Sequence, residues 1–162
     1  MPSNNAIARA RTLCICGSRS FADYGLLCRS IDAALVEWDP SDISQVVHGG
    51  ALGADRLGGR WARERGLRVA ELVPDWRRHG KTAGYFRNAG MVLLADYLIA
   101  FWDGQSKGTA HSIQLAREKG IPLAVVRFDR KRSPIHLETQ TDLIGELRSA
   151  SFYDREQGLK QL

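Results

Sequence analysis

The sequence predicts an α/β fold, with a mainly parallel sheet of about five strands and helices on both faces. The first observation is that short apolar runs of strand length alternate with longer segments in which apolar residues recur at helical spacing. The second is that three of these runs end directly in glycine-rich polar segments. The third is length, because 162 residues suit one domain with a proper core.

The first strand and the first helix are expected near the N-terminus. Residues 13–16 form an apolar run too short for a helix, and the glycine after them permits a sharp turn. A helix over 24–38 follows, because apolar side chains share one helical stripe there: Leu27, Ile31, Leu35 and Trp38. An Asp-Pro-Ser-Asp run ends this helix. Residues 1–11 are polar and are expected to be loose.

The second and third strands enclose the second helix. Residues 45–48 form an apolar run that ends in a Gly-Gly-x-x-Gly segment. The helix after it has Asp55 in its first turn, carries Trp61 toward the core and ends near Gly66, which can cap a helix. Residues 67–73 alternate apolar and polar side chains, which indicates the third strand.

A basic and aromatic segment separates the third strand from the next helix. Residues 75–81 show no periodicity and are expected to form a loop. A helix over 82–95 follows. The residues that we expect it to place against the sheet are Tyr85 or Phe86, Ala89, Val92 and Leu93.

The last two strands enclose the fourth helix. Residues 97–102 are apolar and aromatic, which is typical of a strand covered on both faces. A helix from about residue 109 to 119 follows, and residues 122–128 are the fifth strand. Beyond them, 129–162 is expected to be a basic linker and a helical extension, with serine and proline at the start of a helix near 133–134.

Composition excludes several classes of protein. No apolar run approaches the roughly 18 residues of a membrane span, and the N-terminus lacks the apolar core of a signal peptide, so a cytoplasmic location is expected. The three cysteines come without a Cys/His cluster of zinc-site spacing, so we expect reduced thiols, no metal and no cofactor. The net charge of +5 favours anionic partners of any size.

Three glycine-rich loops are predicted to meet at one edge of the sheet, because they follow the strands at 13–16, 45–48 and 97–102. Ligands of open α/β sheets bind at the carboxyl ends of strands, near the point where the strand order reverses. Free N–H groups and the dipole at a helix N-terminus favour phosphate or carboxylate. The sequence therefore predicts an anion-binding site at this edge.

The candidate ligand-binding residues lie in these loops and on the helix at 82–95. They are Gly17, Ser18, Arg19, His48, Gly49, Gly50, Gly53, Asp55, Lys81, Arg87, Asn88, Asp103, Gly104, Ser106, Gly108 and Thr109. Arg87 and Asp103 are also the candidate catalytic residues. Structural alternatives stay open, because Asp103 can instead cap the next turn, His48 can be a hydrogen-bonded structural residue and Arg87 can pair with a surface carboxylate.

These motifs resemble the YspA-type branch of the SLOG superfamily of Rossmann-like proteins. The matching segments are 17–19, 48–55, 80–91 and 101–109, in the same order and over about residues 12–128. The resemblance implies a single three-layer Rossmann-like domain there, with 1–11 and 129–162 outside it. It also implies that a nucleotide or nucleotide derivative binds at the carboxyl edge of the sheet.

The same superfamily includes phosphoribohydrolases that release cytokinin bases, and the DNA-processing protein of transformation. In the phosphoribohydrolases the catalytic pair is an arginine, matched here by Arg87, and a glutamate, whose position is Ser112 here, preceded by His111. Cleavage of an N-glycosidic bond needs a carboxylate near the developing oxocarbenium ion, so Asp103 or Asp55 would have to supply it. Catalysis and plain binding therefore both stay open.

The motifs and the family resemblance lead to three hypotheses of function. The first is binding of a nucleotide-derived ligand such as ADP-ribose, with hydrolysis of an N-glycosidic or phosphoribosyl bond or with a sensor role. The second is a module that binds single-stranded DNA, favoured by the net charge of +5. The third is a scaffold whose tail mediates assembly. In each case we expect a homo-oligomer and no membrane association.

Overall fold

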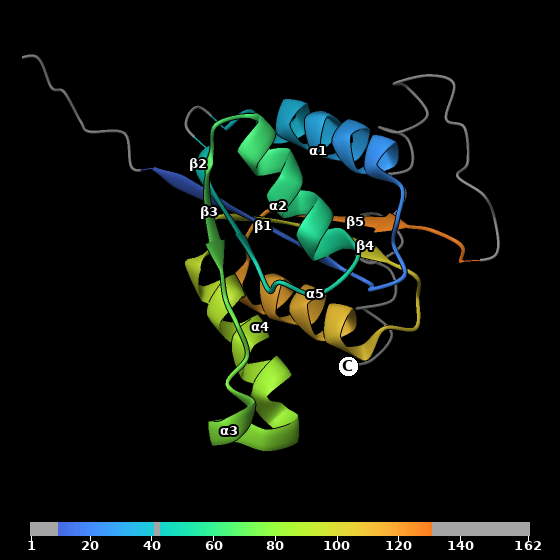
Figure 1. Cartoon of the computed structure of the whole chain (residues 1–162). Helices are drawn as coiled ribbons and strands as arrows, with labels where there is room; N and C mark the ends of the chain where they lie inside the picture. Colours follow the sequence, from blue (N-terminus) through green and yellow to red (C-terminus); the bar gives the residue numbers. More distant parts are fainter. Residues whose placement is uncertain (1–9, 41–42, 131–162) are drawn as a thin grey trace, which may run out of the picture.

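The structure is a computed structural model, and it describes residues 10–40 and 43–130. Its elements follow the predicted alternation (Figure 1). In chain order they are β1 (Arg11–Gly17), α1 (Tyr24–Trp38), β2 (Ile43–His48), α2 (Ala54–Glu64), β3 (Arg68–Glu71), α3 (Trp76–His79), the 3-10 helix η1 (Gly80–Thr82), α4 (Ala83–Leu94), β4 (Tyr97–Trp102), α5 (Lys107–Lys119) and β5 (Leu123–Arg127). The predicted helical extension from residue 131 onward, and residues 1–9 of the predicted loose N-terminus, lie outside the described residues.

The five strands form one sheet in the order β3-β2-β1-β4-β5, and every neighbouring pair is parallel. The chain first builds outward from β1 through β2 to β3, then crosses to the other side of β1 and continues through β4 to β5. The strand order therefore reverses between β1 and β4. In open parallel sheets this is the place where the loops separate and leave a crevice at the carboxyl ends.

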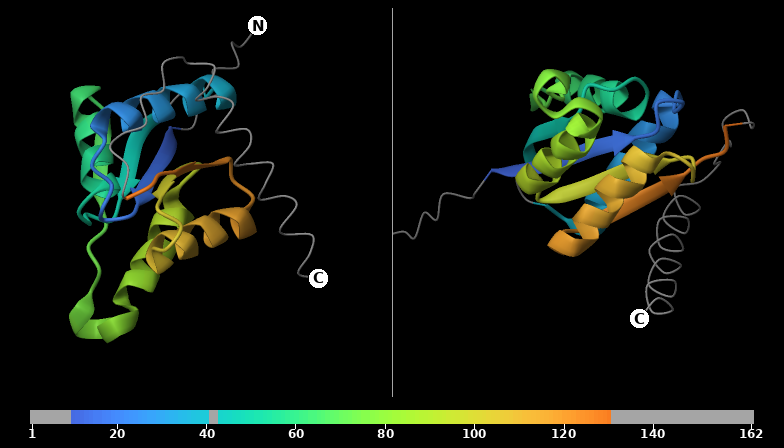
Figure 2. Two further views of the ribbon diagram at one scale, coloured as in Figure 1. Left: turned by 90° about the vertical axis from the view of Figure 1, so that its right-hand side faces the viewer. Right: turned by 90° about the horizontal axis from the view of Figure 1, so that it is seen from below.

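Two helices cover each face of the sheet, which confirms the predicted three-layer α/β arrangement. Helices α1 and α2 lie on one face and α4 and α5 on the other (Figure 2). Strand β1 supplies both cores, since alternate side chains of a strand point to opposite faces. Leu13 and Ile15 pack with α1 and α2, whereas Cys14 and Cys16 pack with α4 and α5.

One predicted loop is wrong, because residues 76–82 are helical. Asp75 caps α3, and its Oδ1 accepts a hydrogen bond of 3.0 Å from the backbone N–H of Arg78. The Thr82 hydroxyl then donates to the carbonyl of His79 at 2.7 Å. A helix of four residues is too short to show a periodic apolar pattern, so the sequence carried only the capping residue as a signal.

The predicted inner face of α4 is also largely wrong. Val92 is buried as expected, but Tyr85, Phe86, Ala89 and Leu93 are exposed to solvent. The buried residues of this helix are Ala83, Asn88, Met91 and Val92, of which Met91 and Val92 belong to the core on this face of the sheet. Because apolar residues occur all around this helix, its sequence offers two stripes, and the buried one includes a polar asparagine that a hydrophobic pattern passes over.

Glycines set how closely α2 approaches the sheet. A Cβ on Gly58 would lie 2.5 Å from Cγ2 of Ile15, which is fully buried in β1. Gly84 in α4 is also a helical glycine, but a Cβ there would meet nothing nearer than the Trp76 ring at 3.9 Å. A substitution by alanine at Gly58 therefore tests packing against the sheet, and the same substitution at Gly84 tests helix propensity alone.

We expect Gly58→Ala to lower the free energy of unfolding by about 1–3 kcal/mol, because the added methyl group overpacks the contact with Ile15. Gly84→Ala should raise it by about 0.5–1 kcal/mol, because alanine is the better helix former. Denaturant unfolding of both variants measures this. A Gly58→Ala protein as stable as the Gly84→Ala protein would contradict the close approach.

Candidate functional site

A cleft of about 500 Å³ opens at the carboxyl edge of the sheet, where the strand order reverses between β1 and β4. Its lining comes from the end of β1, from the loops after β1, β2 and β4, from the first turn of α2, from α4 and α5, and from the segment after β5. The lining residues are Cys16, Gly17, Arg19, Ser20, Ala51, Asp55, Arg87, Asn88, Met91, Ser106, Gly108, Thr109, Ser112 and Arg130. Three of them are arginines that approach from three separate segments of the chain.

The structure brings half of the sequence candidates into this lining. These are Gly17, Arg19, Asp55, Arg87, Asn88, Ser106, Gly108 and Thr109. The lining does not include Ser18, His48, Gly49, Gly50, Gly53, Lys81, Asp103 or Gly104. Sequence reasoning passed over Arg130, because it lies in the basic linker beyond the last predicted strand and only the sheet order brings it near the cleft.

The carboxyl of Asp55 holds two of the glycine loops. It lies in the first turn of α2, is only 3% exposed, and its Oδ2 accepts a hydrogen bond of 2.8 Å from the N–H of Gly49. The backbone amides of Ala51 and Gly17 also bond to this carboxyl. Burial raises its pKa to about 6, since it outweighs these hydrogen bonds and the nearby charge of Arg87.

Arg87 and Asn88 connect α4 to both neighbouring loops. Nη1 of Arg87 donates to the carbonyl of Gly49, and its Nε donates to Oδ1 of Asn88 at 3.0 Å. Nδ2 of Asn88 in turn donates to the carbonyl of Gly108 at 3.1 Å. A Cβ on Gly49 would collide with this guanidinium, so the glycine is required for the contact. These bonds use two of the five N–H donors of the arginine.

The N-terminus of α5 faces the cleft through Gly108 and Thr109. Ser106 is the capping residue, and its hydroxyl accepts hydrogen bonds from the backbone of Thr109 at 3.4 Å and from the Thr109 hydroxyl at 2.9 Å. The indole N–H of Trp102 donates to the carbonyl of Ser106 at 3.1 Å. The cap thus fixes the helix start, whose first N–H groups have no partner within the helix.

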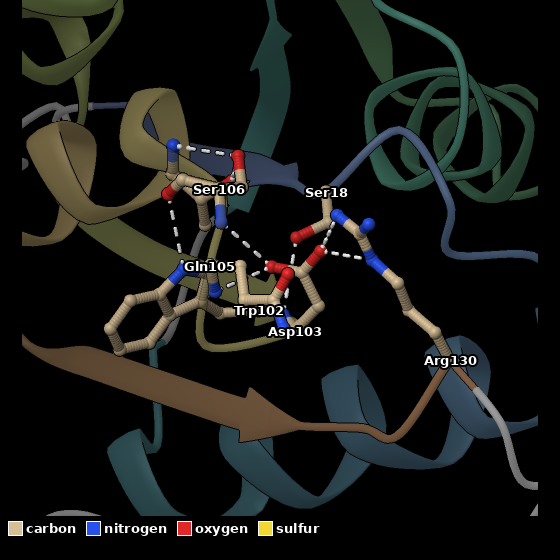
Figure 3. A network of polar contacts seen from close by, with 7 residues as sticks. Ser18, Trp102, Asp103, Gln105, Ser106 and Arg130 are labelled. Atoms are coloured by element: carbon tan, nitrogen blue, oxygen red, sulfur yellow. Dashed lines mark hydrogen bonds and ion pairs between the residues drawn. The ribbon is translucent and has the colours of Figure 1, made fainter.

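Asp103 organises the loop before α5 (Figure 3). Its Oδ1 accepts hydrogen bonds from the backbone amides of Gln105 at 2.9 Å and Ser106 at 2.8 Å, and its Oδ2 pairs with Nε of Arg130 at 2.6 Å. The side chain is 1% exposed. Burial alone would raise the pKa of this carboxyl, but the amides of Ser106 and Gln105 and the Arg130 guanidinium outweigh it and hold the pKa well below its usual range. Such a carboxylate is a weak base, which fits the capping alternative.

His48 and Gly53 also have local structural partners. Nδ1 of His48 accepts a hydrogen bond of 3.0 Å from the N–H of Gly50, and the ring is buried against Gly59 of α2. Burial lowers the pKa of His48, so the neutral ring is favoured. Gly53 has φ +80°, and a Cβ there would lie 2.4 Å from the carbonyl of Ser18. Glycine is needed here so that the loops after β1 and β2 can touch.

The potential metal ligands among the described residues do not cluster. Within 10–40 and 43–130 there is no group of three His, Cys, Asp or Glu side chains that could hold a metal ion. The cysteines Cys14, Cys16 and Cys28 are free thiols. Among the helices in this part of the chain, none has the length and apolar character needed to cross a membrane.

Comparison with known proteins gives a family and a fold. The family described as "YspA, cpYpsA-related SLOG family" matches residues 12–79, which end before α4 begins. A protein described as "Gene 61 protein" of Mycobacterium phage D29 is 46% identical over 92 residues, which cover 53% of this chain and 72% of the phage protein.

Among solved structures, the chain is similar to the DNA processing protein A (DprA) of Streptococcus pneumoniae. The TM-score is 0.57 and the sequence identity 16% over 87% of this chain. The match spans 56% of the DprA chain, so this chain corresponds to about half of that protein. At this identity the similarity establishes the α/β fold.

We expect the free energy of unfolding to fall as the pH rises, because Asp55 titrates, and we expect Asp55→Asn to remove this contribution. The pKa of Asp55 is about 6 in the folded chain and 3.8 ordinarily, so the unfolded chain releases this proton at lower pH. The free energy of unfolding therefore falls as the pH rises from 3.8 to about 6. The loss in the wild type is up to roughly 3 kcal/mol, at 1.36 kcal/mol per pKa unit. Asparagine keeps an oxygen that can accept the Gly49 hydrogen bond.

Denaturant unfolding of both proteins between pH 4 and pH 7 tests this. Other titrating groups are common to the two proteins, so the difference between them isolates Asp55. Parallel pH profiles for wild type and Asp55→Asn would contradict the raised pKa.

Proposed function

We propose that this chain, which belongs to the YspA, cpYpsA-related SLOG family, binds a nucleotide or nucleotide-derived ligand in the cleft at the carboxyl edge of its sheet. The observation that carries the proposal is that Arg19, Arg87 and Arg130 line the same cleft as Gly108 and Thr109 at the N-terminus of α5. A cleft with three guanidinium groups and a helix N-terminus suits the phosphate of such a ligand.

In this proposal the phosphate lies over the first turn of α5. The backbone N–H groups there would donate to its oxygens, and the arginines would add charge-assisted hydrogen bonds. Cys16 and Met91 supply apolar lining for the sugar or the base. Arg87 supports the proposal in a further way, since Gly49 and Asn88 hold its guanidinium in place before a ligand arrives.

The proposal is for binding, and a hydrolytic step in this cleft would rely on Asp55. Asp55 lines the cleft and has a pKa of about 6, which suits proton transfer near neutral pH. Asp103 is tied to two amides and Arg130, and its low pKa makes it a poor base. Ser112 lines the cleft with a hydroxyl whose hydrogen bond goes to the carbonyl of Gly108.

Titration calorimetry with ADP-ribose, AMP and NAD tests the binding. We expect Arg19→Ala to weaken the affinity about 10- to 100-fold, because a hydrogen bond to a charged group contributes about 1.5–3 kcal/mol. Arg60→Ala is the matched control, since Arg60 pairs with Glu64 on α2 at 2.8 Å, and neither residue lines the cleft. No binding of any of the three compounds, or equal losses in both variants, would overturn the proposal; chromatography of the same mixtures detects a released base.

A second candidate function is binding of single-stranded nucleic acid, and α3 with η1 favours it. This segment projects from the domain at the carboxyl edge (Figure 1) and exposes Trp76, Arg77, Arg78 and Lys81. No Asp or Glu occurs from Trp76 to Ala95. Exposed aromatic rings among basic side chains suit stacked bases and a phosphate backbone. The similarity to DprA contributes only the fold to this proposal.

Fluorescence anisotropy with a labelled oligothymidine tests this candidate. Trp76→Ala should weaken binding by about 1–3 kcal/mol, the usual loss when one base-stacking ring is removed. Val36→Ala, at an exposed apolar position of α1, is the control and should bind like the wild type. Absence of binding at roughly 50 mM salt, where backbone contacts are strongest, would exclude the candidate.

A further inference from the structure

One peptide unit, which joins Gly49 to Gly50, lies between the His48 ring at the end of β2 and the Arg87 guanidinium of α4. Its N–H, which belongs to Gly50, donates to Nδ1 of His48 at 3.0 Å. Its carbonyl, which belongs to Gly49, accepts a hydrogen bond from Nη1 of Arg87. Because a peptide unit is planar and rigid, both bonds depend on a single orientation of this 49–50 unit.

The ring of His48 has little freedom to move. The carbonyl of His48 accepts a hydrogen bond of 2.9 Å from the N–H of Leu72, which ties the end of β2 to the segment after β3. The side chain is 2% exposed, and a Cβ on Gly59 of α2 would lie 2.6 Å from Nε2. The 49–50 unit, in contrast, has a glycine on each side, so it can turn with little steric cost.

The ring is neutral in this arrangement, and its proton lies on Nε2. Nδ1 accepts the Gly50 hydrogen bond and so carries no hydrogen of its own. Nε2 is buried and has no hydrogen-bond partner within residues 10–40 and 43–130. A further proton would therefore bind at Nδ1, where it would face the N–H of Gly50. Two N–H groups cannot bond to each other, so this hydrogen bond would be lost.

We propose that protonation of His48 turns the 49–50 unit and releases Arg87 from Gly49. The proton comes from solvent and binds the lone pair of Nδ1, and no other covalent bond forms or breaks. When the N–H turns away from the ring, the carbonyl of the same unit turns away from the guanidinium. His48 is thus a positioning residue for Arg87, which lines the cleft.

The charged groups around the ring come from three elements. Burial lowers the pKa of His48, and Arg63 of α2 and Arg87 of α4 lower it further, whereas Glu71 of β3 raises it. Glu71 pairs in register with His48, and its carboxylate lies so close to Gly50 that a Cβ there would collide with it. This carboxylate favours the protonated ring. The change is therefore expected on acidification below pH 6.5, the ordinary pKa of histidine.

Nuclear magnetic resonance tests this link without a ligand. In the wild type at about pH 7.5, the ring nitrogens of His48 should show a proton on Nε2 alone. This measurement needs no variant, and a proton on Nδ1 would overturn the proposal. The titration is then followed in an Asp55→Asn protein, the parent, because Asp55 bonds to Gly49 and has a pKa of about 6. The Gly50 amide and the Nε–H of Arg87 should shift with the same midpoint as the His48 ring.

His48→Asn in this parent is the matched variant. The oxygen of asparagine can accept the Gly50 N–H in place of Nδ1, but the side chain does not titrate. At about pH 5 the Gly50 amide should exchange with solvent about tenfold faster in the parent than in His48→Asn, the loss expected for one hydrogen bond. His79→Asn, at the end of α3, is the control and should behave like the parent. Equal exchange in all three proteins would overturn the proposal.

The consequence for ligand binding rests on the proposed function. Calorimetry with AMP at about pH 7.5 and about pH 5.5 should show a greater loss of affinity on acidification in the parent than in His48→Asn. The reason is that Arg87 loses its fixed place only in the parent, whereas the phosphate of AMP titrates alike in both measurements. Equal losses would contradict the positioning role. The resonance data decide the link even where AMP does not bind, so a failure of either proposal is recognised separately.

Discussion

The buried carboxyl of Asp55 is the contact on which the carboxyl edge of this domain depends. From the first turn of α2 it accepts hydrogen bonds from Gly49, Ala51 and Gly17, and so joins the loops after β2 and β1. Backbone amides buried in glycine loops lose free energy unless they find an acceptor, and one carboxyl serves three of them. The raised pKa of Asp55 is the electrostatic cost of placing it there.

Around this centre, each wall of the cleft is held by a contact between distant parts of the chain. Arg87 joins α4 to Gly49, Asn88 joins α4 to the start of α5, and Arg130 pairs with Asp103 across the ends of β5 and β4. The cleft is therefore shaped in advance by the protein itself. A preformed site loses little conformational entropy when a ligand binds, which supports a binding function for this edge of the sheet.

Helix α4 shows where a local sequence pattern fails. Arg87, Asn88 and Met91 of this helix line the cleft, whereas its apolar residues Phe86 and Leu93 are exposed, so a single amphipathic pattern does not describe it. The expectation that Phe86, Ala89 and Leu93 face the sheet failed for this reason. Which side of the helix is buried depends on its neighbours in the fold, and these include the core around Met91 and Val92 and the contact of Asn88 with Gly108.

The sequence by itself determined the alternation of strands and helices, since α1 and β4 have the predicted bounds, and it placed the glycine loops after three strands. These features follow from periodicity and turn chemistry, which are local. Only the tertiary structure decided the strand order and, with it, which candidates line the cleft. Asp103 turned toward its own loop and Arg130 reached the cleft because β5 lies beside β4. Such pairings arise from contacts between residues far apart in the chain, which no local pattern records.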